Sequence, residues 1–392
     1  MANRLSLDGS SEGIPVKKHT PLGVEEGFFD DAPRDSSRVK RQIVTEYFDY
    51  YMRVMARDGK VAGHVDLFAG PGIYGLGEES TPMIICRQVV ADPRLRAQVK
   101  LWFNEGDPDN YEKLRANIDK ISGIDGLANV PKITQHVISD AFTARLSAMR
   151  TPSFIFADPC GYKGLSLHLI ATALKPFGND CIFFLNYNRI NMKLSYAVME
   201  ESVNTFFHAA RADQVRNEIR GLKSPQQREQ VILNAVKKAL QDDAGAHSLT
   251  FGFRTREGGG TSHHLVYATK NVRALTQMKR IYTKASSEIT DGVGSLDYDP
   301  RDFGPKTLPL FSPLDEVRDR LLRVFAGHTL TFDELIVKES GTDFTDTVYR
   351  NALLDLEEEG CVTMSPVAQE RRFRSDGRRR SLPGATTITF PG

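Results

Sequence analysis

A glycine-rich turn directly after an apolar segment is the clearest chemical signature in the sequence. The run Val65-Asp-Leu-Phe-Ala-Gly-Pro-Gly-Ile-Tyr-Gly75 contains the pattern GxGxxG. Glycines allow a sharp turn and leave the backbone bare for a ligand, and a helix that follows can direct free N–H groups at that ligand. The pattern by itself suits NAD as well. We predict that the turn binds an adenosine-containing cofactor through Asp66, Phe68, Ala69, Gly70, Gly72 and Tyr74.

Two acidic residues downstream add to this prediction. Glu105 ends the apolar run Leu101-Trp-Phe-Asn-Glu105, where a carboxylate can accept hydrogen bonds from ribose hydroxyls. It lies further from the glycines than the roughly 20 residues of the dinucleotide fingerprint. Asp107 is the alternative, but the apolar run points at Glu105. Asp140 follows a third apolar run and is predicted to reach the adenine amino group, or else to cap the next helix.

The segment Phe154-Ile-Phe-Ala-Asp-Pro-Cys-Gly-Tyr162 is the candidate catalytic motif. An Asp-Pro step at the carboxyl end of a buried strand lies in the crevice where open α/β sheets bind ligands. We assign catalytic roles to Asp158 and Pro159, which hold an amino or hydroxyl nucleophile beside a transferable methyl group, and to Tyr162, which stacks on a planar substrate. Methyl transfer chiefly requires in-line alignment. The alternative is a plain turn between a strand and a helix.

Strands and helices alternate along the part of the chain that carries these residues. Apolar periodicity and turn residues predict helix 37–57, strand 63–68, helix 81–91, strand 99–104, helix 110–121, strand 133–138, helix 141–149, strand 153–157, helix 165–175 and strand 181–186. Such alternation favours a parallel sheet with helices on both faces.

The pattern changes after residue 186. Helices 194–210 and 226–242 precede strands 248–254 and 262–269, which the run Gly258-Gly259-Gly260 joins as a hairpin, and helix 272–285 follows. A parallel sheet that ends in an antiparallel hairpin is typical of S-adenosylmethionine-dependent methyltransferases and unusual among dehydrogenases. We therefore predict an α/β fold of the Rossmann-like methyltransferase type, with S-adenosylmethionine as the cofactor.

A smaller domain is expected at the C-terminus. Residues 287–313 are rich in Gly, Pro, Ser and Asp and are predicted to be a linker. Helix 314–325, a helix that opens at the capping box Thr331-Phe-Asp-Glu334, helix 343–359 and strands 361–365 and 386–390 then predict a winged-helix-like α+β domain. The expected organisation is a flexible tail 1–35, a methyltransferase-like domain 36–286, the linker 287–313 and the winged-helix-like domain 314–392.

An arginine-rich wing lies between the last two predicted strands. We expect its side chains to face solvent and to bind nucleic acid along the phosphates, with DNA and RNA both open. The alternatives are a solvated loop or a docking surface for a protein. The residues concerned are Arg371, Arg372, Arg374, Arg378, Arg379 and Arg380.

Four runs together resemble the three-Cys-motif partner family. They are Val65-Asp-Leu-Phe-Ala-Gly-Pro-Gly-Ile-Tyr74, Phe156-Ala-Asp-Pro-Cys-Gly161, Phe183-Phe-Leu-Asn186 and Leu265-Val-Tyr-Ala-Thr269. These are bacterial proteins with a methyltransferase-like domain, named for a frequent genomic neighbour that carries a three-cysteine motif. The resemblance covers roughly residues 40–285 and implies the fold and the cofactor class more than a reaction. It also makes a three-Cys-motif protein a candidate partner.

Cys160 is a candidate nucleophile that the sequence argues against. A Pro-Cys step after Asp-Leu-Phe-Ala-Gly resembles the cytosine-C5 methyltransferases, which use that cysteine covalently. No Glu-Asn-Val element follows, and members of the three-Cys-motif partner family mostly carry an aromatic residue at this place. The predicted function is therefore a methyltransferase that acts on nucleic acid. Its rivals are a catalytically silent partner protein and an NAD-dependent enzyme.

Composition sets limits on these predictions. The 392 residues carry 51 basic and 50 acidic side chains, so any nucleic-acid surface must be local. The four cysteines form no CxxC pair and the nine histidines form no ligand-spaced cluster, so no metal site is predicted. No apolar run approaches the roughly 18 residues that span a bilayer, and we expect a soluble, cytoplasmic protein without a membrane partner.

Overall fold

The computed structural model describes residues 35–159, 164–194, 200–255, 260–301, 312–374, 377 and 379–392. The predicted tail before residue 35 and the predictions at Cys160, Tyr162 and Arg378 lie outside these residues. Among the described residues, no helix is both long and apolar enough to cross a lipid bilayer.

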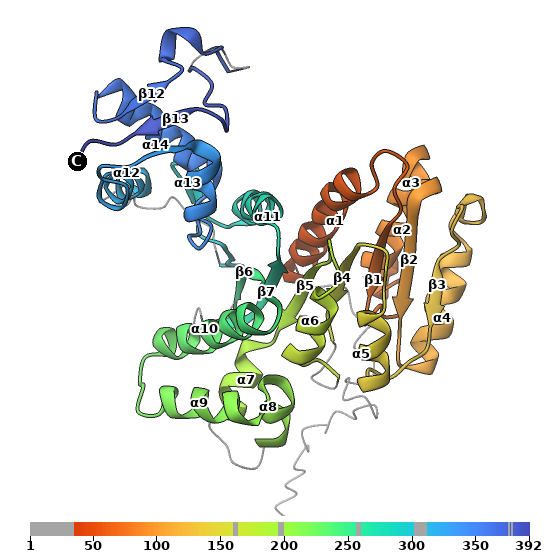
Figure 1. Ribbon diagram of the computed structural model, residues 1–392. Helices are drawn as coiled ribbons and strands as arrows, with labels where there is room; N and C mark the ends of the chain where they lie inside the picture. Colours follow the sequence, from red (N-terminus) through yellow and green to blue (C-terminus); the bar gives the residue numbers. More distant parts are fainter. Residues whose placement is uncertain are drawn as a thin grey trace, which may run out of the picture.

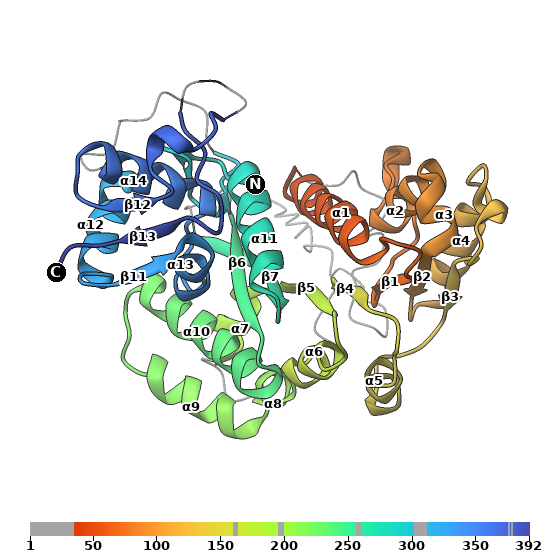
Figure 2. The same cartoon turned by 45° about the horizontal axis from the view of Figure 1, so that its top comes forward.

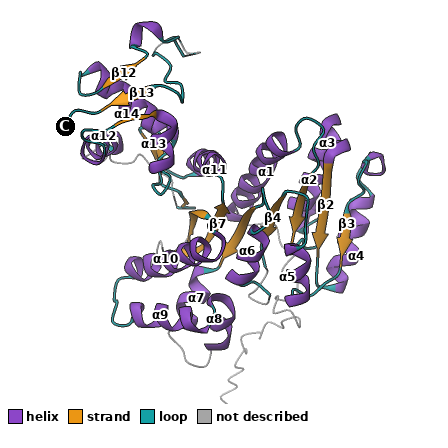
Figure 3. Cartoon of the chain, in the orientation of Figure 1, coloured by secondary structure: helices purple, strands orange, loops and turns teal. Residues whose placement is uncertain are grey.

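An eight-stranded sheet forms the centre of the larger part of the chain (Figures 1 and 3). Its strand order is β10-β6-β7-β5-β4-β1-β2-β3, and among the described pairings only those of β7 are antiparallel. This order and the antiparallel hairpin at one side confirm the predicted Rossmann-like methyltransferase sheet. The strands are β1 (Ala62–Asp66), β2 (Val99–Asn104), β3 (Lys132–Thr134), β4 (Ser153–Ala157), β5 (Asp180–Leu185), β6 (His247–Arg254), β7 (Thr261–Thr269) and β10 (Asp297–Tyr298).

Helices cover both faces of this sheet (Figures 1 and 2). One face packs against α1 (Asp35–Met55), α2 (Thr81–Ala91), α4 (Pro108–Asp119) and α11 (Val272–Ala285), with α3 (Pro93–Gln98) beside α2. The other face packs against α5 (Asp140–Ser147), α6 (Leu167–Leu174), α7 (Tyr187–Leu194), α8 (Glu200–Phe207), α9 (Ala209–Ile219) and α10 (Pro225–Ala244). Two apolar clusters therefore hold the sheet, one on each face.

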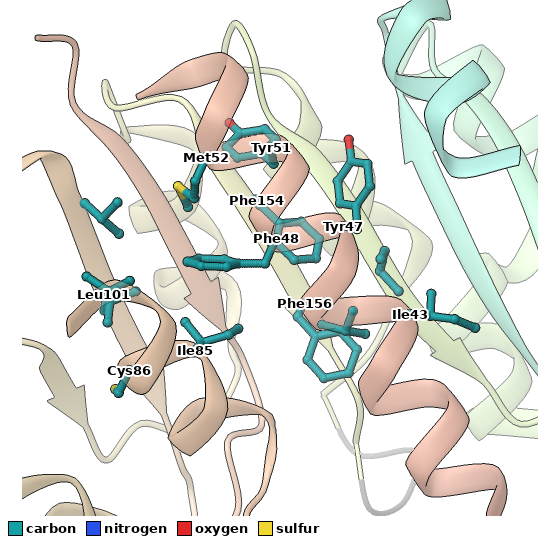
Figure 4. Close-up of a cluster of buried hydrophobic side chains, with 14 of the residues drawn as sticks. Ile43, Tyr47, Phe48, Tyr51, Met52, Ile85, Cys86, Leu101, Phe154 and Phe156 are labelled. Carbon is teal, nitrogen blue, oxygen red and sulfur yellow. The ribbon is translucent and has the colours of Figure 1, made fainter. Parts of the chain in front are cut away.

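Helix α1 supplies much of the first cluster (Figure 4). Tyr47, Phe48 and Tyr51 recur at helical spacing and are buried against the middle of the sheet. The ring of Tyr47 meets the ring of Phe154 of β4 edge-on, with centroids 5.1 Å apart. The predicted amphipathic helix is confirmed, and its apolar face anchors it across β1 and β4.

Three predicted segments differ from the structure. The helix expected over 194–210 is replaced by the end of α7, by α8 and by the start of α9, and His208 at φ 72° separates the last two. The strand expected over 133–138 ends at Thr134, because the backbone beyond it bonds the side chain of Asn104 instead of a neighbouring strand. The helix α3 was not predicted.

The expected linker carries short strands. Ile289–Thr290 and Val293–Gly294 pair as the hairpin β8–β9, and β10 adds to the edge of the large sheet beside β6. Polar residues favoured the prediction of a linker, but two-residue strands leave no periodic pattern to detect.

The C-terminal part has its own core. It contains α12 (Pro313–Val324), β11 (Thr329–Thr331), α13 (Phe332–Lys338), α14 (Asp346–Glu358), β12 (Thr363–Ser365) and β13 (Thr387–Thr389), with β13 central in a three-stranded antiparallel sheet. The capping box is present, since Thr331 and Glu334 bond each other's backbone N–H groups. Arg280 of α11 pairs with Asp346 at 2.6 Å and so joins this part to the large sheet unit.

Candidate active site

Asp66 lies at the carboxyl end of β1, close to the middle of the sheet. Its side chain is buried, and its Oδ1 accepts a hydrogen bond from the backbone N–H of Phe68 at 3.0 Å. Burial raises the pKa of Asp66 to about 8, with Asp158 and Glu105 adding negative charge nearby. With this pKa the carboxyl group is largely protonated at pH 7. A cation bound beside it would lower the pKa and favour the carboxylate.

The glycine turn after β1 is held by α2, α4 and the residue before α2. Gly70 and Gly72 have φ values of 68° and 87°, which favour glycine. Asn117 of α4 donates from Nδ2 to the carbonyl oxygen of Pro71 at 2.9 Å, and Ser80 N donates to the carbonyl oxygen of Gly72 at 2.8 Å. The turn that the sequence predicted is therefore present and braced.

The packing around the turn also favours glycine at position 72. A Cβ added there would lie 3.2 Å from Met83 Sδ and 3.3 Å from Leu114 Cδ1, so it would point into the packing between α2 and α4. The packing of two helices against the turn is therefore one reason for glycine at this position, and the φ of 87° is another.

Glu105 follows β2 and reaches back to the turn. Its Oε2 accepts from Gly70 N at 2.7 Å and its Oε1 accepts from Asp107 N at 2.8 Å, and burial raises its pKa. Asp107 caps α4 by accepting from Asn110 N at 3.0 Å. The two predicted alternatives thus have different places, and Glu105 is the one that contacts the glycine turn.

The other predicted cofactor residues spread along the same edge. Ala69 N donates to the carbonyl oxygen of Asn104 at 2.9 Å, and Tyr74 N donates to that of Glu78 at 2.8 Å, while Phe68 is half-buried. Asp140 does not end a strand. It is an exposed residue in the first turn of α5, where Ser139 is the capping residue.

Asn104 was not predicted and joins three segments of the site. Its Nδ2 donates to the carbonyl oxygens of Leu67 at 3.2 Å and His136 at 2.9 Å, and its Oδ1 accepts from Thr134 Oγ1 at 3.0 Å. An amide with both donors and acceptors used in this way fixes the ends of β1, β2 and β3 relative to one another. A polar residue within an otherwise apolar strand end was the available signal.

Asp158 follows β4 and has a cationic partner in helix α1. Lys40 of α1 bonds its Oδ2, and the same ammonium group lies 4.9 Å from the centroid of the Phe184 ring. The side chains of Lys40 and Asp158 are 17% and 23% exposed, so the pair is accessible. The structure also places Pro159 directly after Asp158 at this edge. Lys40 was not predicted, because a lysine on the polar side of a helix does not indicate which distant carboxylate it will meet.

The arginine cluster is largely bonded to helix α14. Arg371 is 3% exposed and pairs with Glu357, which contradicts the prediction that it faces solvent. Arg379 pairs with Asp355 at 2.7 Å, and Arg374 donates to Asn351 Oδ1 at 3.0 Å. Two acidic side chains of α14 thus pair with arginines of the wing, and the amide of Asn351 bonds a third.

Two further arginines complete the described part of the wing. Arg380 donates to the carbonyl oxygen of Arg371 at 2.9 Å and lies over the ring of Phe373 at 3.8 Å. Arg372 is exposed. The described part of the wing is therefore folded onto α14, with Arg372 exposed.

Comparison with known proteins yields structural similarity at low identity. No protein-family model matches the chain, and no curated protein matches its sequence. Protein LPL1258 from Legionella pneumophila is similar over 61% of this chain and 86% of its own, with 13% identity and a TM-score of 0.36. The methyltransferase domain of bacterial CtHen1 is similar over 59% of this chain and 100% of its own, with 10% identity and a TM-score of 0.31.

A third similar structure is the N-terminal domain of human METTL16 in complex with SAH. It covers 58% of this chain and 70% of its own, with 10% identity and a TM-score of 0.27.

Proposed function

We propose that the chain is an S-adenosylmethionine-dependent methyltransferase. The observation that carries this proposal is the position of Glu105, which is buried, bonded to Gly70 N at 2.7 Å and placed at the carboxyl end of β2. A carboxylate offers about four lone-pair positions, and two backbone N–H groups use two of them. The remaining positions suit a pair of ribose hydroxyls.

Asp66 fits the cationic part of the same cofactor. One backbone N–H bonds its buried carboxyl group, and burial raises its pKa to about 8. A sulfonium and an ammonium group nearby would stabilise the ionised form of Asp66. S-adenosylmethionine supplies an electrophilic methyl group when bound, and an acceptor at Asp158 would lie on the same edge of the sheet.

Asp158 is the proposed positioning group for the acceptor. Its carboxylate can accept a hydrogen bond from an amino or hydroxyl nucleophile, and Lys40 holds it in place. Pro159 restricts the backbone that follows it. Alignment of two reactants is the main contribution that such a site makes to a displacement reaction.

Nucleic acid is the proposed acceptor class, and basic residues beside the edge support it. Helix α7 follows β5 directly and carries Arg189 and Lys193 without any acidic residue. Burial, and then the charge of Arg189, lower the pKa of Lys193. Arg228 of α10 joins them by donating to Asn191 Oδ1 at 2.9 Å. Concentrated positive charge of this kind favours a phosphate backbone.

The C-terminal part is proposed to be a winged-helix-like domain that helps to hold this substrate. Its order of three helices, with β11 before α13 and the strands β12 and β13 after α14, supports that reading. Arg372 offers an exposed cation there, with the other described wing arginines bonded internally. Membership of the three-Cys-motif partner type stays a prediction that rests on the sequence runs.

The experiment is calorimetry followed by a methyl-transfer assay. We expect S-adenosylmethionine and its demethylated product to bind with dissociation constants on the order of micromolar, and NAD not to bind. Labelled methyl groups should then appear in single-stranded RNA or DNA. Binding of NAD alone would refute the proposal.

A catalytically silent protein is the second candidate, and the Lys40–Asp158 pair favours it. An ion pair at the acceptor carboxylate occupies part of its hydrogen-bonding capacity. This candidate predicts that the cofactor binds and that no methyl group is transferred. Capture of the genomic neighbour with its three-cysteine motif would then be the test of a role as a partner protein.

A further inference from the structure

A row of rings continues the carboxyl edge of the sheet beyond Asp158. The ring of His263 in β7 stacks on that of Phe253 in β6, with centroids 4.5 Å apart and an interplanar angle of 14°. His263 also lies 4.6 Å from the ring of Phe184 in β5, with an interplanar angle of 36°. Three neighbouring strands therefore present one continuous aromatic surface.

Strand register explains why the rings meet. Phe253 and His263 are paired residues of β6 and β7, and Phe184 pairs with Leu265, two residues beyond His263. Since side chains alternate along a strand, these rings share the sheet face that α1 covers. Ser262 Oγ lies 2.7 Å from His263 Nδ1 and so helps to orient the imidazole.

The rings are continuous with the polar pair of the proposed active site. Lys40 Nζ lies 4.9 Å from the Phe184 centroid and bonds Asp158, which is itself close enough to Asp66 to influence its charge. The edge thus runs from the proposed cofactor position, through an ion pair, to a stacked set of rings. Phe253 is fully buried, whereas Phe184 and His263 are half-buried and reach solvent.

We propose that Phe184 and His263 form a stacking surface for one nucleobase of the acceptor strand, with the amino-bearing edge of that base turned to Lys40 and Asp158. This inference rests on the proposed function and names the group that the same site would methylate. It identifies the substrate as a single-stranded or flipped nucleotide, because a base within a duplex cannot reach a surface at a sheet edge.

The chemistry of the pair favours adenine or cytosine over uracil or thymine. Both preferred bases carry an exocyclic amino group beside a ring nitrogen with a lone pair. The amino group can donate to Asp158, and the ring nitrogen can accept from Lys40. An ammonium has three donors and a carboxylate about four acceptor positions, so both keep capacity after bonding each other.

The test measures the binding of two fluorescein-labelled single-stranded DNA oligonucleotides by anisotropy, with and without S-adenosylhomocysteine. One contains only adenine and cytosine, and the other only thymine. Phe184→Leu and His263→Leu remove a ring while keeping apolar volume, and His263→Phe keeps the ring. The matched control is Phe177→Leu, because Phe177 is 87% exposed and precedes β5, at the opposite edge of the sheet.

We expect the two ring-removing variants to lose roughly 5- to 150-fold in affinity for the adenine–cytosine strand, the range given by stacking one base on an aromatic ring. His263→Phe and Phe177→Leu should stay within about twofold of wild type. Lys40→Met should reduce the preference for the adenine–cytosine strand over the thymine strand. Thermal melting and calorimetry with S-adenosylhomocysteine report on folding and on the cofactor site in every variant.

Two results would overturn the stacking surface. One is unchanged strand binding in both ring-removing variants that melt like wild type, and the other is equal binding of the two strands by wild type. Failure of S-adenosylhomocysteine to bind would instead refute the proposed function. The two failures are distinguishable because strand binding is measured without the cofactor as well.

Discussion

Two buried aspartates lie at opposite ends of the parallel strands of the same sheet, and they differ in their hydrogen-bond partners. Asp180 begins β5 and accepts from Tyr47 Oη at 2.6 Å, with the side chains of Thr269 and Tyr267 also bonded to it. Asp66 ends β1 and, among the described residues, accepts one hydrogen bond, from the backbone N–H of Phe68. Burial raises the pKa of both, to about 6 for Asp180 and to about 8 for Asp66.

The difference is the basis for giving Asp180 a structural role and for proposing that Asp66 binds the cofactor. Hydroxyl groups of the protein donate hydrogen bonds to Asp180 and so stabilise its carboxylate form. The hydrogen-bonding capacity of this buried group is therefore used within the protein. Asp66 has no comparable set among the described contacts, and it shares its edge with Glu105 and with the pair of Lys40 and Asp158. Incomplete satisfaction of a buried carboxyl group at a ligand-binding edge is what a binding site for a cation requires.

The largest expected effect is that of Asp158→Ala on catalysis. Loss of the positioning carboxylate should lower the rate of methyl transfer by roughly 100- to 1000-fold, as for the loss of one preorganised polar group, and leave cofactor affinity nearly unchanged. Single-turnover assays with saturating S-adenosylmethionine measure this. Asp180→Asn is the matched control at the other edge, and an equal loss in both variants would erase the distinction.

Glu105→Gln should mainly weaken cofactor binding. The substitution keeps the shape of the side chain but removes the charge that receives hydrogen bonds, so we expect affinity to fall roughly 10- to 100-fold. Calorimetry with S-adenosylhomocysteine measures the change. Asp107→Asn provides the comparison, because Asp107 caps α4 and should affect stability more than affinity. A larger affinity loss in Asp107→Asn would reverse the assignment.

Asp66→Asn should change the pH dependence of cofactor binding. The free protein holds a proton on Asp66 up to a pKa of about 8, and a bound cation lowers that pKa, so binding releases the proton. Wild-type affinity for S-adenosylmethionine should therefore rise from pH 6 toward about 8, by about tenfold or less per pH unit, and then level off. Asp66→Asn should lack this rise. Parallel pH profiles for the two proteins would contradict the role of Asp66.

The smallest effects concern the stability contributed by Asp180. Its pKa is raised from 3.8 to about 6, so the folded protein binds the proton more tightly than the unfolded chain does. Its contribution to the free energy of unfolding is therefore full below about pH 4 and is lost as the pH rises through about 6. Urea denaturation across this range should show that decline in wild type and not in Asp180→Asn.

Tyr47→Phe tests the same network from its donor side. Removing the hydroxyl leaves the buried carboxylate with fewer donors and should cost about 1–3 kcal/mol at pH 7. Tyr50→Phe, on the same helix and half-buried, should cost less. Methyl transfer at permissive temperature should be unaffected in both, in contrast to the variants at the carboxyl edge.

Local patterns were enough to predict the sheet and the glycine turn. Strand 99–104, strand 153–157 and helix 81–91 agree with β2, β4 and α2 because short apolar runs bounded by turn residues carry their own signal. Glu105 was found for the same reason, since it directly ends an apolar strand. The site was predictable where one strand and its following turn define it.

Contacts between distant segments were not predictable. Lys40 and Asp158 are 118 residues apart, and only the packing of α1 across the sheet brings them together. The rings of Phe184, His263 and Phe253 meet through strand register, which a single sequence does not specify. The wing failed for a related reason. The wing arginines were predicted to face solvent, whereas Arg371 is buried and pairs with Glu357 of α14.

The contact between α11 and α14 affects how a long ligand can bind. Arg280 pairs with Asp346, whose side chain is only 6% exposed, and two residues further along α11 Tyr282 Oη donates to the carbonyl oxygen of Leu265 in β7. The same strand carries His263. A nucleic-acid strand that binds both to the C-terminal part and at His263 is held at two points with a set spacing. Its second contact therefore forms at high effective concentration. Affinity should then depend on strand length, with a threshold at the shortest oligomer that bridges the two.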